Sequence, residues 1–425
     1  MQMRRVIILM LGLILAPAVS HAAPSEAEKR AVIKTYADIA EATCSDSLAT
    51  ARKLQRTIDA FLTRPSAASL QSAKAAWLAA RVPYMQSEAF RFGNKIVDDW
   101  EGKVNAWPLD EGLIDYVDLS YGKSSKENPL FTANIVASRS LTVAGKTVDV
   151  RKITKALLSS VLHEGGGVEA NVATGYHAIE FLLWGQDLNG TGRGAGKRAW
   201  TDFSVEKCTI GHCERRRAYL KVATGLLVDD LAWMVAQWSA KGAARVGLTK
   251  GDADKGIAAI ITGIGSLSYG ELAGERMKLG LMLHDPEEEH DCFSDNTHNS
   301  HFYDVVGISN VYFGRYKRID GSTVKGPSLA ALVRKVSPVA AKAMEARLAT
   351  TRAAFTTLKQ RAEKVEAYDQ MIAEKNKKGN AVVQAAIDAL VAQTKALEQA
   401  VKALGLKPIA FEGSDSLDDP SKVFK

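Results

Sequence analysis

The chain has 425 residues, of which 46% are hydrophobic and 24% are charged, and its formal net charge is +7. This composition excludes a disordered or collagen-like chain and is that of an ordinary globular protein. Basic and acidic residues are interspersed, which excludes a nucleic-acid-binding stripe and predicts solvated helix faces. A chain of this length exceeds what one hydrophobic core usually serves, so we expect two domains.

The N-terminal segment has the layout of a secretory signal peptide. Arg4 and Arg5 precede the apolar run 6–16, and small residues follow at 20–23. We therefore predict a signal peptide over residues 1–23, cleaved after Ala22 or Ala23, and an exported mature protein. No stretch reaches the roughly 18 uncharged apolar residues of a spanning helix, so we expect no membrane span in the mature chain.

Helical signals run along nearly the whole chain, whereas strand signals are scarce. The spacing of apolar residues predicts helices over 26–61, 66–82, 152–162, the segment GYHAIE, 214–240, 252–283 and 329–406, with a loop-rich region over 93–126. Pro65 ends the first helix, and the last helix is expected to divide near 376–380 into a hairpin. Long consecutive helices with short connections indicate an all-α fold of helical bundles.

The domain boundary is predicted from an interruption between two helices. Glycines and charges gather over residues 242–251. We therefore place an N-terminal helical domain at 24–245 and a C-terminal helical domain at 246–425.

The segment GYHAIE places two chemically active side chains on one helix face. His177 and Glu180 lie three residues apart among apolar residues at helical spacing. An imidazole and a carboxylate in this arrangement can share one metal ion. They can equally form a buried pair in which the carboxylate fixes the imidazole tautomer. The motif alone does not decide between these two interpretations.

A second polar cluster covers residues 284–304. It contains four of the eight histidines, which are His284, His290, His298 and His301. We interpret it as a metal or polar-ligand site on a loop, and the alternative is an acidic surface loop. His301 and Asp304, followed by Gly307, also parallel His177 and Glu180, followed by Gly185. This repetition would suit two related bundles that face each other.

Charged residues also interrupt apolar helices at two places, SEAFRFG and GELAGERM. They are Glu88, Arg91, Glu271, Glu275 and Arg276. Charges on an apolar face must be paired or bound to a ligand when they are buried. Both structural salt bridges and ligand binding remain open at this point.

The four cysteines allow three pairings. Cys208 and Cys213 lie five residues apart with Gly211 between them, and export favours oxidation, so we predict a disulfide. The alternative is a metal knuckle that uses the neighbouring His212, although no second cysteine pair would complete a zinc site. Cys44 and Cys292 are left without an assigned role.

Several common enzyme patterns are missing from the sequence. The glycine-rich loop 185–196 follows a helix and departs from GxxxxGK[ST], so we predict a surface loop and not a phosphate site. There is no HExxH zinc-protease helix, no GxSxG elbow and no CxxCH haem attachment site.

Longer segments of the chain, taken together, resemble one protein family. These segments are ARVPYMQSEAFRFG, AWPLDEGLIDYVD, GYHAIEFLLWGQDLNGTG, CERRRAYLK, GELAGERM, EEEHDCFSDNTH and GISNVYFGRY. They cover nearly the whole mature chain and look like the imelysin family, more narrowly its iron-regulated protein A branch. Cys44 stands where we would expect an aromatic residue in this branch.

The resemblance implies two helical-bundle domains related by duplication, with a functional pocket at their interface. It also implies a periplasmic or outer-surface location and a link to bacterial iron uptake. By similarity, His177 and Glu180 are the motif pair and the candidate metal ligands, with iron or zinc as the metal. The expected ligand-binding residues are Glu88, Arg91, Asp110, Glu271, Arg276, Ser294, Asp295 and His298.

Three functions follow as hypotheses. The first is binding of iron, or of a haem or siderophore-type ligand, at an interdomain site on which residues 294–298 and 88–91 converge with the GYHAIE helix. The second is a metallopeptidase, although HxxE supplies only two of the three protein ligands that such a site needs. The third is a helical adaptor of an outer-membrane uptake component, which needs neither metal nor turnover.

Overall fold

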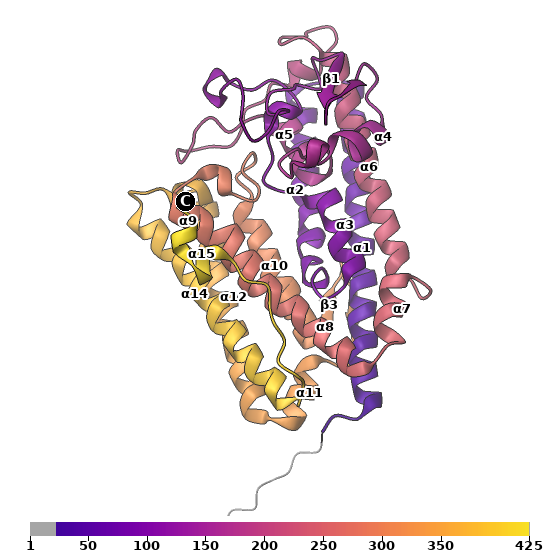
Figure 1. Ribbon diagram of the computed structural model, residues 1–425, viewed down its shortest axis with the longest axis vertical. Helices are drawn as coiled ribbons and strands as arrows, with labels where there is room; N and C mark the ends of the chain where they lie inside the picture. Colours follow the sequence, from indigo (N-terminus) through magenta and orange to yellow (C-terminus); the bar gives the residue numbers. More distant parts are fainter. Residues whose placement is uncertain (1–22, 425) are drawn as a thin grey trace, which may run out of the picture.

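The computed structural model describes residues 23–424, and Figure 1 shows two groups of long helices standing side by side. The predicted signal peptide falls on residues 1–22 and Ala23, so all but its last residue lies outside the described residues. The all-α class predicted from the sequence is confirmed, since nearly all of the regular structure is helical.

Helices of three kinds and two short hairpins make up the regular structure of residues 23–424. The α-helices are α1 (Glu26–Thr63), α2 (Ala67–Met85), α3 (Lys95–Asn105), α4 (Lys155–Leu157), α5 (Gly175–Trp184), α6 (Cys213–Trp238), α7 (Ala243–Thr249), α8 (Ala253–Ser266), α9 (Gly280–Leu283), α10 (Thr297–Phe313), α11 (Leu329–Val336), α12 (Pro338–Lys364), α13 (Tyr368–Ile372), α14 (Lys377–Ala403) and α15 (Asp415–Asp418). Two π-helical segments are η4 (Leu158–Leu162) and η7 (Leu267–Leu279). The 3-10 turns are η1 (Glu88–Phe90), η2 (Glu111–Leu113), η3 (Leu119–Tyr121), η5 (Gly165–Gly167), η6 (Trp200–Phe203), η8 (Pro286–Glu288) and η9 (Pro420–Lys422). Two antiparallel hairpins pair β1 (Ser140–Val143) with β2 (Lys146–Asp149), and β3 (Arg315–Lys317) with β4 (Thr323–Lys325).

The first bundle is built around α1, and both α2 and α6 pack along it. A capping box at Ser25 begins α1, and a second one at Ser66, directly after Pro65, begins α2. Trp77 of α2 is fully buried, and its indole Nε1 donates to the backbone carbonyl of Tyr176 at 3.0 Å. This contact fixes the start of α5 against α2 inside the bundle.

The second bundle contains α12 and α14, with α10 and η7 packed against them (Figure 1). Its core is a separate group of buried side chains, among them Leu272, Met277, Phe355 and Leu390. The sequence predicted one hairpin over 329–406. The structure adds a break at Ser337, which caps α12, and inserts α13 in the connection between α12 and α14.

A continuous helical run, Ala253–Leu283, links the two bundles, because α8 packs on α1 while η7 packs on α14. By length and composition alone, this run could cross a membrane. However, 72% of its most apolar window is buried inside the protein, as in the core helix of a globular fold.

One helix was missed in the region predicted to be loop-rich. Residues 95–105 form α3, which buries Val97, Trp100 and Val104 on one face. The helix is short, and Gly93 and the Trp107–Pro108 pair on either side of it are typical of loops. The boundary near 242–251 and the duplication stay predictions, and α7 occupies most of that boundary segment.

Candidate metal centre

The helix that carries His177 and Glu180 is a core helix. Every residue of α5 is buried, and His177 and Glu180 are only 1% and 0% exposed. The helix begins at Gly175, whose φ is +82° and where a Cβ would lie 2.5 Å from the carbonyl oxygen of Val104. Only glycine therefore allows the start of α5 to lie this close to the end of α3. This close packing places α5 deep inside the protein.

Glu180 is the hydrogen-bond partner of His177. Its Oε2 lies 3.0 Å from the imidazole Nδ1, and its Oε1 accepts from the backbone N and the Oγ of Ser294, at 3.0 and 2.6 Å. When Glu180 is ionised it accepts from Nδ1–H, which leaves the lone pair on Nε2. Burial and the nearby Asp291 raise the pKa of Glu180, so a cation arriving at the cluster would favour the ionised form.

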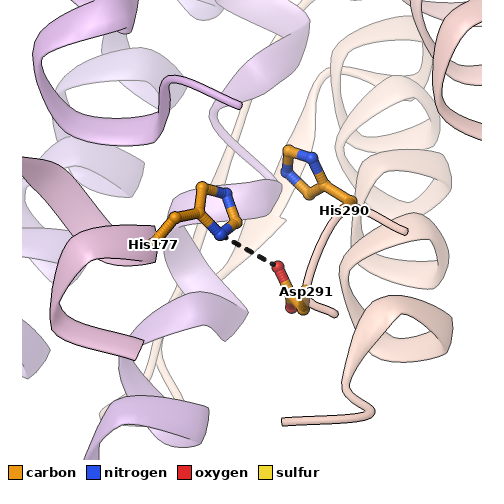
Figure 2. A group of neighbouring side chains, drawn as sticks. All are labelled: His177, His290 and Asp291. Carbon is orange, nitrogen blue, oxygen red and sulfur yellow. Dashed lines mark ion pairs between the residues drawn. The ribbon is translucent and has the colours of Figure 1, made fainter. Parts of the chain in front are cut away.

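Three side chains converge beside this pair. One ligand atom from each of His177, His290 and Asp291 lies within 4.8 Å of the other two (Figure 2). The two imidazole centroids are 4.8 Å apart, and His177 Nδ1 is 4.0 Å from Asp291 Oδ1. His177 comes from α5, whereas His290 and Asp291 come from the segment between η8 and α10. We call these three residues the histidine–aspartate cluster.

Asp291 is held in place by several donors. Arg81 Nη2 contacts Asp291 Oδ1 at 2.8 Å, while Asn296 Nδ2 and Ser300 Oγ donate to Oδ2 at 2.7 and 2.5 Å. Burial alone would raise the pKa of this carboxyl, but the charge of Arg81 and the hydrogen bonds from Ser300 and Asn296 lower it below its ordinary value. Asp291 is therefore an ionised carboxylate in a fixed position.

The imidazoles of this region have nitrogens without partners. Within the described residues, His177 Nε2, His290 Nδ1 and both ring nitrogens of His301 are buried and accept or donate no hydrogen bond. Burial lowers the pKa of His177 and of His301 to about 3, and the pKa of His290 also falls well below its ordinary value. These rings are therefore neutral, which is the form that binds metals.

The donor set fits a metal ion. Two neutral imidazoles and a carboxylate are ligands that zinc and iron both accept, and buried ring nitrogens without partners are otherwise costly. A ligand histidine normally has its second nitrogen bonded to a carboxylate or carbonyl, and Glu180 supplies such a carboxylate to His177. Glu180 thus fixes the ring of His177 and is not one of the three converging donors.

Four of the sequence-predicted residues belong to one ion-pair network. Arg276 contacts Glu88 at 2.8 Å, Glu271 at 2.7 Å and Asp304 at 3.3 Å. Arg91 contacts Glu271 at 3.3 Å. The structure thus pairs Glu88, Arg91, Glu271 and Arg276 as salt bridges, which was one of the two interpretations left open.

The other predicted residues lie in different surroundings. Ser294 contacts Glu180 directly, so the loop 294–298 reaches the GYHAIE helix as expected. Asp295 is half-buried and has a φ of +55°. His298 lies beside Asn299, and burial lowers its pKa to about 4. Asp110 accepts from Asn128 and Tyr121, at 2.5 and 3.4 Å.

Sequence reasoning did not single out three residues of this region. His290 was one of four histidines in a dense polar segment, and Asp291 one of many acids there. Arg81 could have been found from the sequence. It follows Trp77 by four residues and so lies on the apolar face of α2, where a charged side chain indicates a buried partner of opposite charge.

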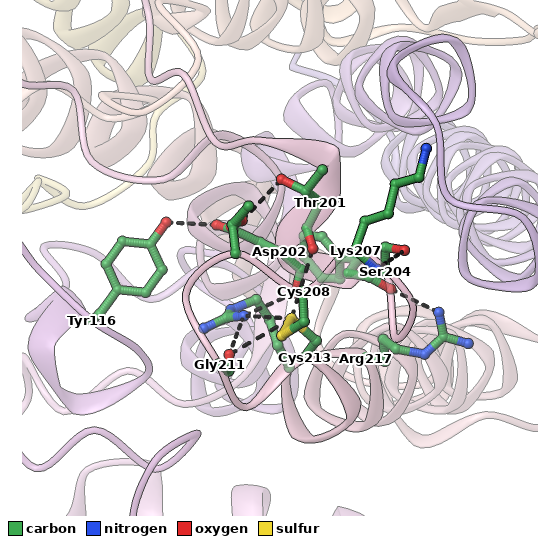
Figure 3. The surroundings of a disulfide bond; sticks show 12 residues. Tyr116, Thr201, Asp202, Ser204, Lys207, Cys208, Gly211, Cys213 and Arg217 are labelled. Carbon is green, nitrogen blue, oxygen red and sulfur yellow. Dashed lines mark hydrogen bonds between the residues drawn. A yellow bond between two sulfur atoms is a disulfide. The ribbon is translucent and has the colours of Figure 1, made fainter.

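Cys208 and Cys213 are joined by a disulfide in the structure, with Cα atoms 5.9 Å apart (Figure 3). Both sulfur atoms are therefore used, and the alternative metal knuckle with His212 is not formed. Close by, Tyr116 donates to Asp202 at 2.6 Å, and Arg217 donates to the carbonyl of Phe203 at 2.8 Å. Cys44 and Cys292 are free thiols.

Fold and site together define an all-α protein with a buried histidine and carboxylate cluster. The sequence matches the family model described as imelysin over residues 33–397, so the chain belongs to the imelysin family.

Individual relatives are similar over most of their length. Iron-regulated protein A of Synechococcus elongatus is 24% identical over 336 residues, which is 76% of this chain and 72% of that protein. A crystal structure from Parabacteroides distasonis, described as an iron-regulated protein A precursor, has a TM-score of 0.65 and 19% identity over 91% of this chain and 97% of its own. An imelysin-like protein from Psychrobacter arcticum has a TM-score of 0.58 and 15% identity over 92% of this chain and 99% of its own. These structures share the fold.

Proposed function

We propose that this chain is an exported binding protein of bacterial iron uptake that holds a metal ion, iron or zinc, at His177, His290 and Asp291. The observation that carries the proposal is the convergence of these three donors within 4.8 Å, in a buried region whose imidazoles have unpartnered nitrogens. The names of the relatives support the link to iron, and the word precursor in one of them supports export.

Each residue has a distinct part in this proposal. His177 and His290 supply neutral imidazole nitrogens, and Asp291 supplies a negative charge. Glu180 orients the ring of His177, and Ser294 in turn fixes Glu180. Arg81 forms an ion pair with Asp291, so these two side chains together carry almost no net charge. The site therefore selects a metal ion over an organic cation through its imidazole nitrogens.

A metallopeptidase is the second candidate, because two histidines and one carboxylate are also the protein ligands of several catalytic zinc sites. In such a site the metal supplies a polarised water, and a peptide must reach it. However, the three side chains are 1%, 1% and 0% exposed, so a polypeptide cannot approach them in this conformation. Burial of this extent favours binding over proteolysis.

Metal analysis of the purified protein tests the proposal. After loading with Fe²⁺ or Zn²⁺ and removal of free metal, we expect wild type to retain stoichiometric metal and His177→Ala to lose it while remaining helical. His298→Ala is the matched control, because His298 is a nearby histidine outside the histidine–aspartate cluster. Wild-type protein that retains no metal would reject the proposal and favour an adaptor that needs none.

A peptidase assay separates the two candidates. We expect little or no cleavage of unfolded protein substrates, even with added zinc. Robust cleavage that is lost in both His177→Ala and Glu180→Ala, with folding intact, would make the peptidase the primary function. Binding of haem or of an iron–siderophore complex, measured by absorbance changes, would show that iron arrives inside a larger ligand.

A further inference from the structure

A groove between α2 and the start of α10 lies directly outside the histidine–aspartate cluster. Its volume is about 250 Å³, so it has room for several water molecules. The residues that line it include Leu78, Ala79 and Arg81 on α2, and Asn296, Asn299 and Ser300 on the other side. We call this cavity the α2–α10 groove.

Three residues that line the α2–α10 groove are the same residues that hold Asp291. Arg81 contacts Asp291 Oδ1, while Asn296 and Ser300 donate to its Oδ2. The groove is therefore separated from a proposed metal ligand by a single layer of residues. Because Arg81 is ion-paired with Asp291, this layer does not present an uncompensated positive charge to an incoming cation.

A metal ion needs a route to the histidine–aspartate cluster, because the three side chains are only 1%, 1% and 0% exposed. A divalent ion with about six waters occupies about 180 Å³, at about 30 Å³ for each water. The α2–α10 groove has room for such a hydrated ion. A second cavity near the cluster, lined by Glu289 and Cys292 among others, has a volume of only about 10 Å³ and cannot hold one.

The side chains between the groove and Asp291 can move without disturbing the helix. Asn296 is the N-cap residue of α10, yet its side chain makes no capping hydrogen bond. Its Nδ2 donates to Asp291 instead, and its Oδ1 accepts from Asn299 at 2.9 Å. Rotation of this side chain away from Asp291 therefore breaks no backbone hydrogen bond. An arriving cation would replace Asn296 and Ser300 as the partner of the carboxylate.

We propose that the α2–α10 groove is the entrance through which a hydrated divalent metal ion reaches the histidine–aspartate cluster, with Asn296 and Ser300 as its gate. The groove is smaller than the pockets of roughly 300–1,000 Å³ that hold larger organic ligands, so the species that enters is the ion and not haem or an iron–siderophore complex. This inference rests on the proposed function, because it requires that the cluster binds metal.

Filling the groove tests the proposal. Ala79 is an exposed residue of the groove, and Ala79→Trp places an indole there. We expect the rate constants of Zn²⁺ uptake and release both to fall by at least about tenfold, as measured by stopped-flow fluorescence with a zinc indicator. The equilibrium dissociation constant should remain that of wild type, because a blocked route slows both directions and leaves the free and bound states unchanged. Ala75→Trp is the matched control, since Ala75 is an exposed alanine one turn earlier on α2 and does not line the groove.

A second variant tests the gate in the opposite direction. Ser300→Ala removes one of the two hydrogen bonds to Asp291 Oδ2 that must break when the ion enters. Zn²⁺ uptake by this variant should therefore be faster than uptake by wild type. An uptake rate equal to or below that of wild type would contradict the gate.

Two results would overturn the entrance. One is a wild-type uptake rate in Ala79→Trp, and the other is equal slowing in Ala75→Trp. Either result would leave the proposed function standing, provided that wild type retains metal. Wild type that retains no metal would instead reject the proposed function and this inference together. Because Ala79 is exposed, we expect Ala79→Trp to unfold at the temperature of wild type, and circular dichroism checks that it is folded.

Discussion

Two buried charged regions of this protein are built on opposite principles. Beside the disulfide, Arg216 uses Nε and Nη2 to bind both oxygens of Asp115, at 2.5 and 2.9 Å, while Nη1 donates to the carbonyl of Asp202 at 2.8 Å. In the histidine–aspartate cluster, by contrast, Asp291 is held in place by Arg81, and the imidazoles of His177 and His290 each keep a nitrogen without a partner.

This difference distinguishes polar groups that stabilise the fold from polar groups that can bind a ligand. Groups whose hydrogen bonds are complete, such as Asp115 and Arg216, have no capacity left for a ligand. Groups that are held rigidly on one side and left open on the other are prepared to bind one. Burial alone does not distinguish the two regions, because Arg216 and His177 are each only 1% exposed.

The largest expected effect is a loss of stability in the fully bonded region. Arg216→Ala leaves the buried Asp115 with Arg198 as its remaining ion-pair partner, at 2.9 Å. We expect the free energy of unfolding to fall by about 3–5 kcal/mol, as measured by urea denaturation. Metal content of the folded fraction should not change. An unfolding free energy equal to that of wild type would show that the network adds no stability.

The next effect should appear only in metal affinity. Loss of a residue that only supports a metal ligand lowers metal affinity by up to about 100-fold. His290→Ala removes a proposed ligand itself, so we expect its affinity for Zn²⁺ to fall by more than about 100-fold. His301→Ala is the matched control, because His301 is equally buried but lies outside the converging donors. Isothermal titration measures both, and a larger loss for His301→Ala would require a different ligand set.

A smaller effect is expected from the residue that fixes Glu180. Ser294→Ala removes the hydroxyl that donates to Glu180 Oε1 at 2.6 Å, whereas the backbone N of Ser294 still donates at 3.0 Å. We expect Zn²⁺ affinity to fall by about tenfold, the lower end for such supporting contacts. A loss as large as that of His290→Ala would place Glu180 or Ser294 among the ligands themselves.

The smallest effect is a pH dependence that arises from the buried Asp369 of α13. Burial, and then Asp295, raise the pKa of Asp369 from 3.8 to about 7. The folded state therefore binds this proton more tightly than the unfolded state, so Asp369 stabilises the fold below about pH 4 and loses this contribution as the pH rises through about 7. Asp369→Asn cannot titrate. In a chelator-containing buffer, its unfolding temperature relative to wild type should rise between those two pH values, and a constant difference would contradict the shift.

Much of the fold could be predicted from local patterns. The helices α1, α2 and α6 follow from apolar spacing, and the stop at Pro65 from the geometry of proline. The short helix α3 could not be found in this way, because it spans only 11 residues and its neighbours favour loops. Local propensity identifies long periodic elements and fails where tertiary packing stabilises a short one.

Only part of the candidate site could be predicted from the sequence. His177 and Glu180 could be recognised because they share a helix face, where spacing alone brings side chains together. His290 and Asp291 lie in an irregular segment, and only tertiary packing brings them to α5. No periodicity connects residues that meet in this way, so the acids and histidines of 284–304 could not be ranked before the structure was known.

The distance along the chain between the proposed ligands has a consequence for how the protein is loaded. His177 and His290 are 113 positions apart, from 290 − 177, so the unfolded chain contains no preformed site. A metal ion at the proposed site would therefore bind after folding and would not nucleate it. An ion that binds the folded state alone would stabilise it, so the metal-loaded protein should unfold at a higher temperature than the metal-free protein.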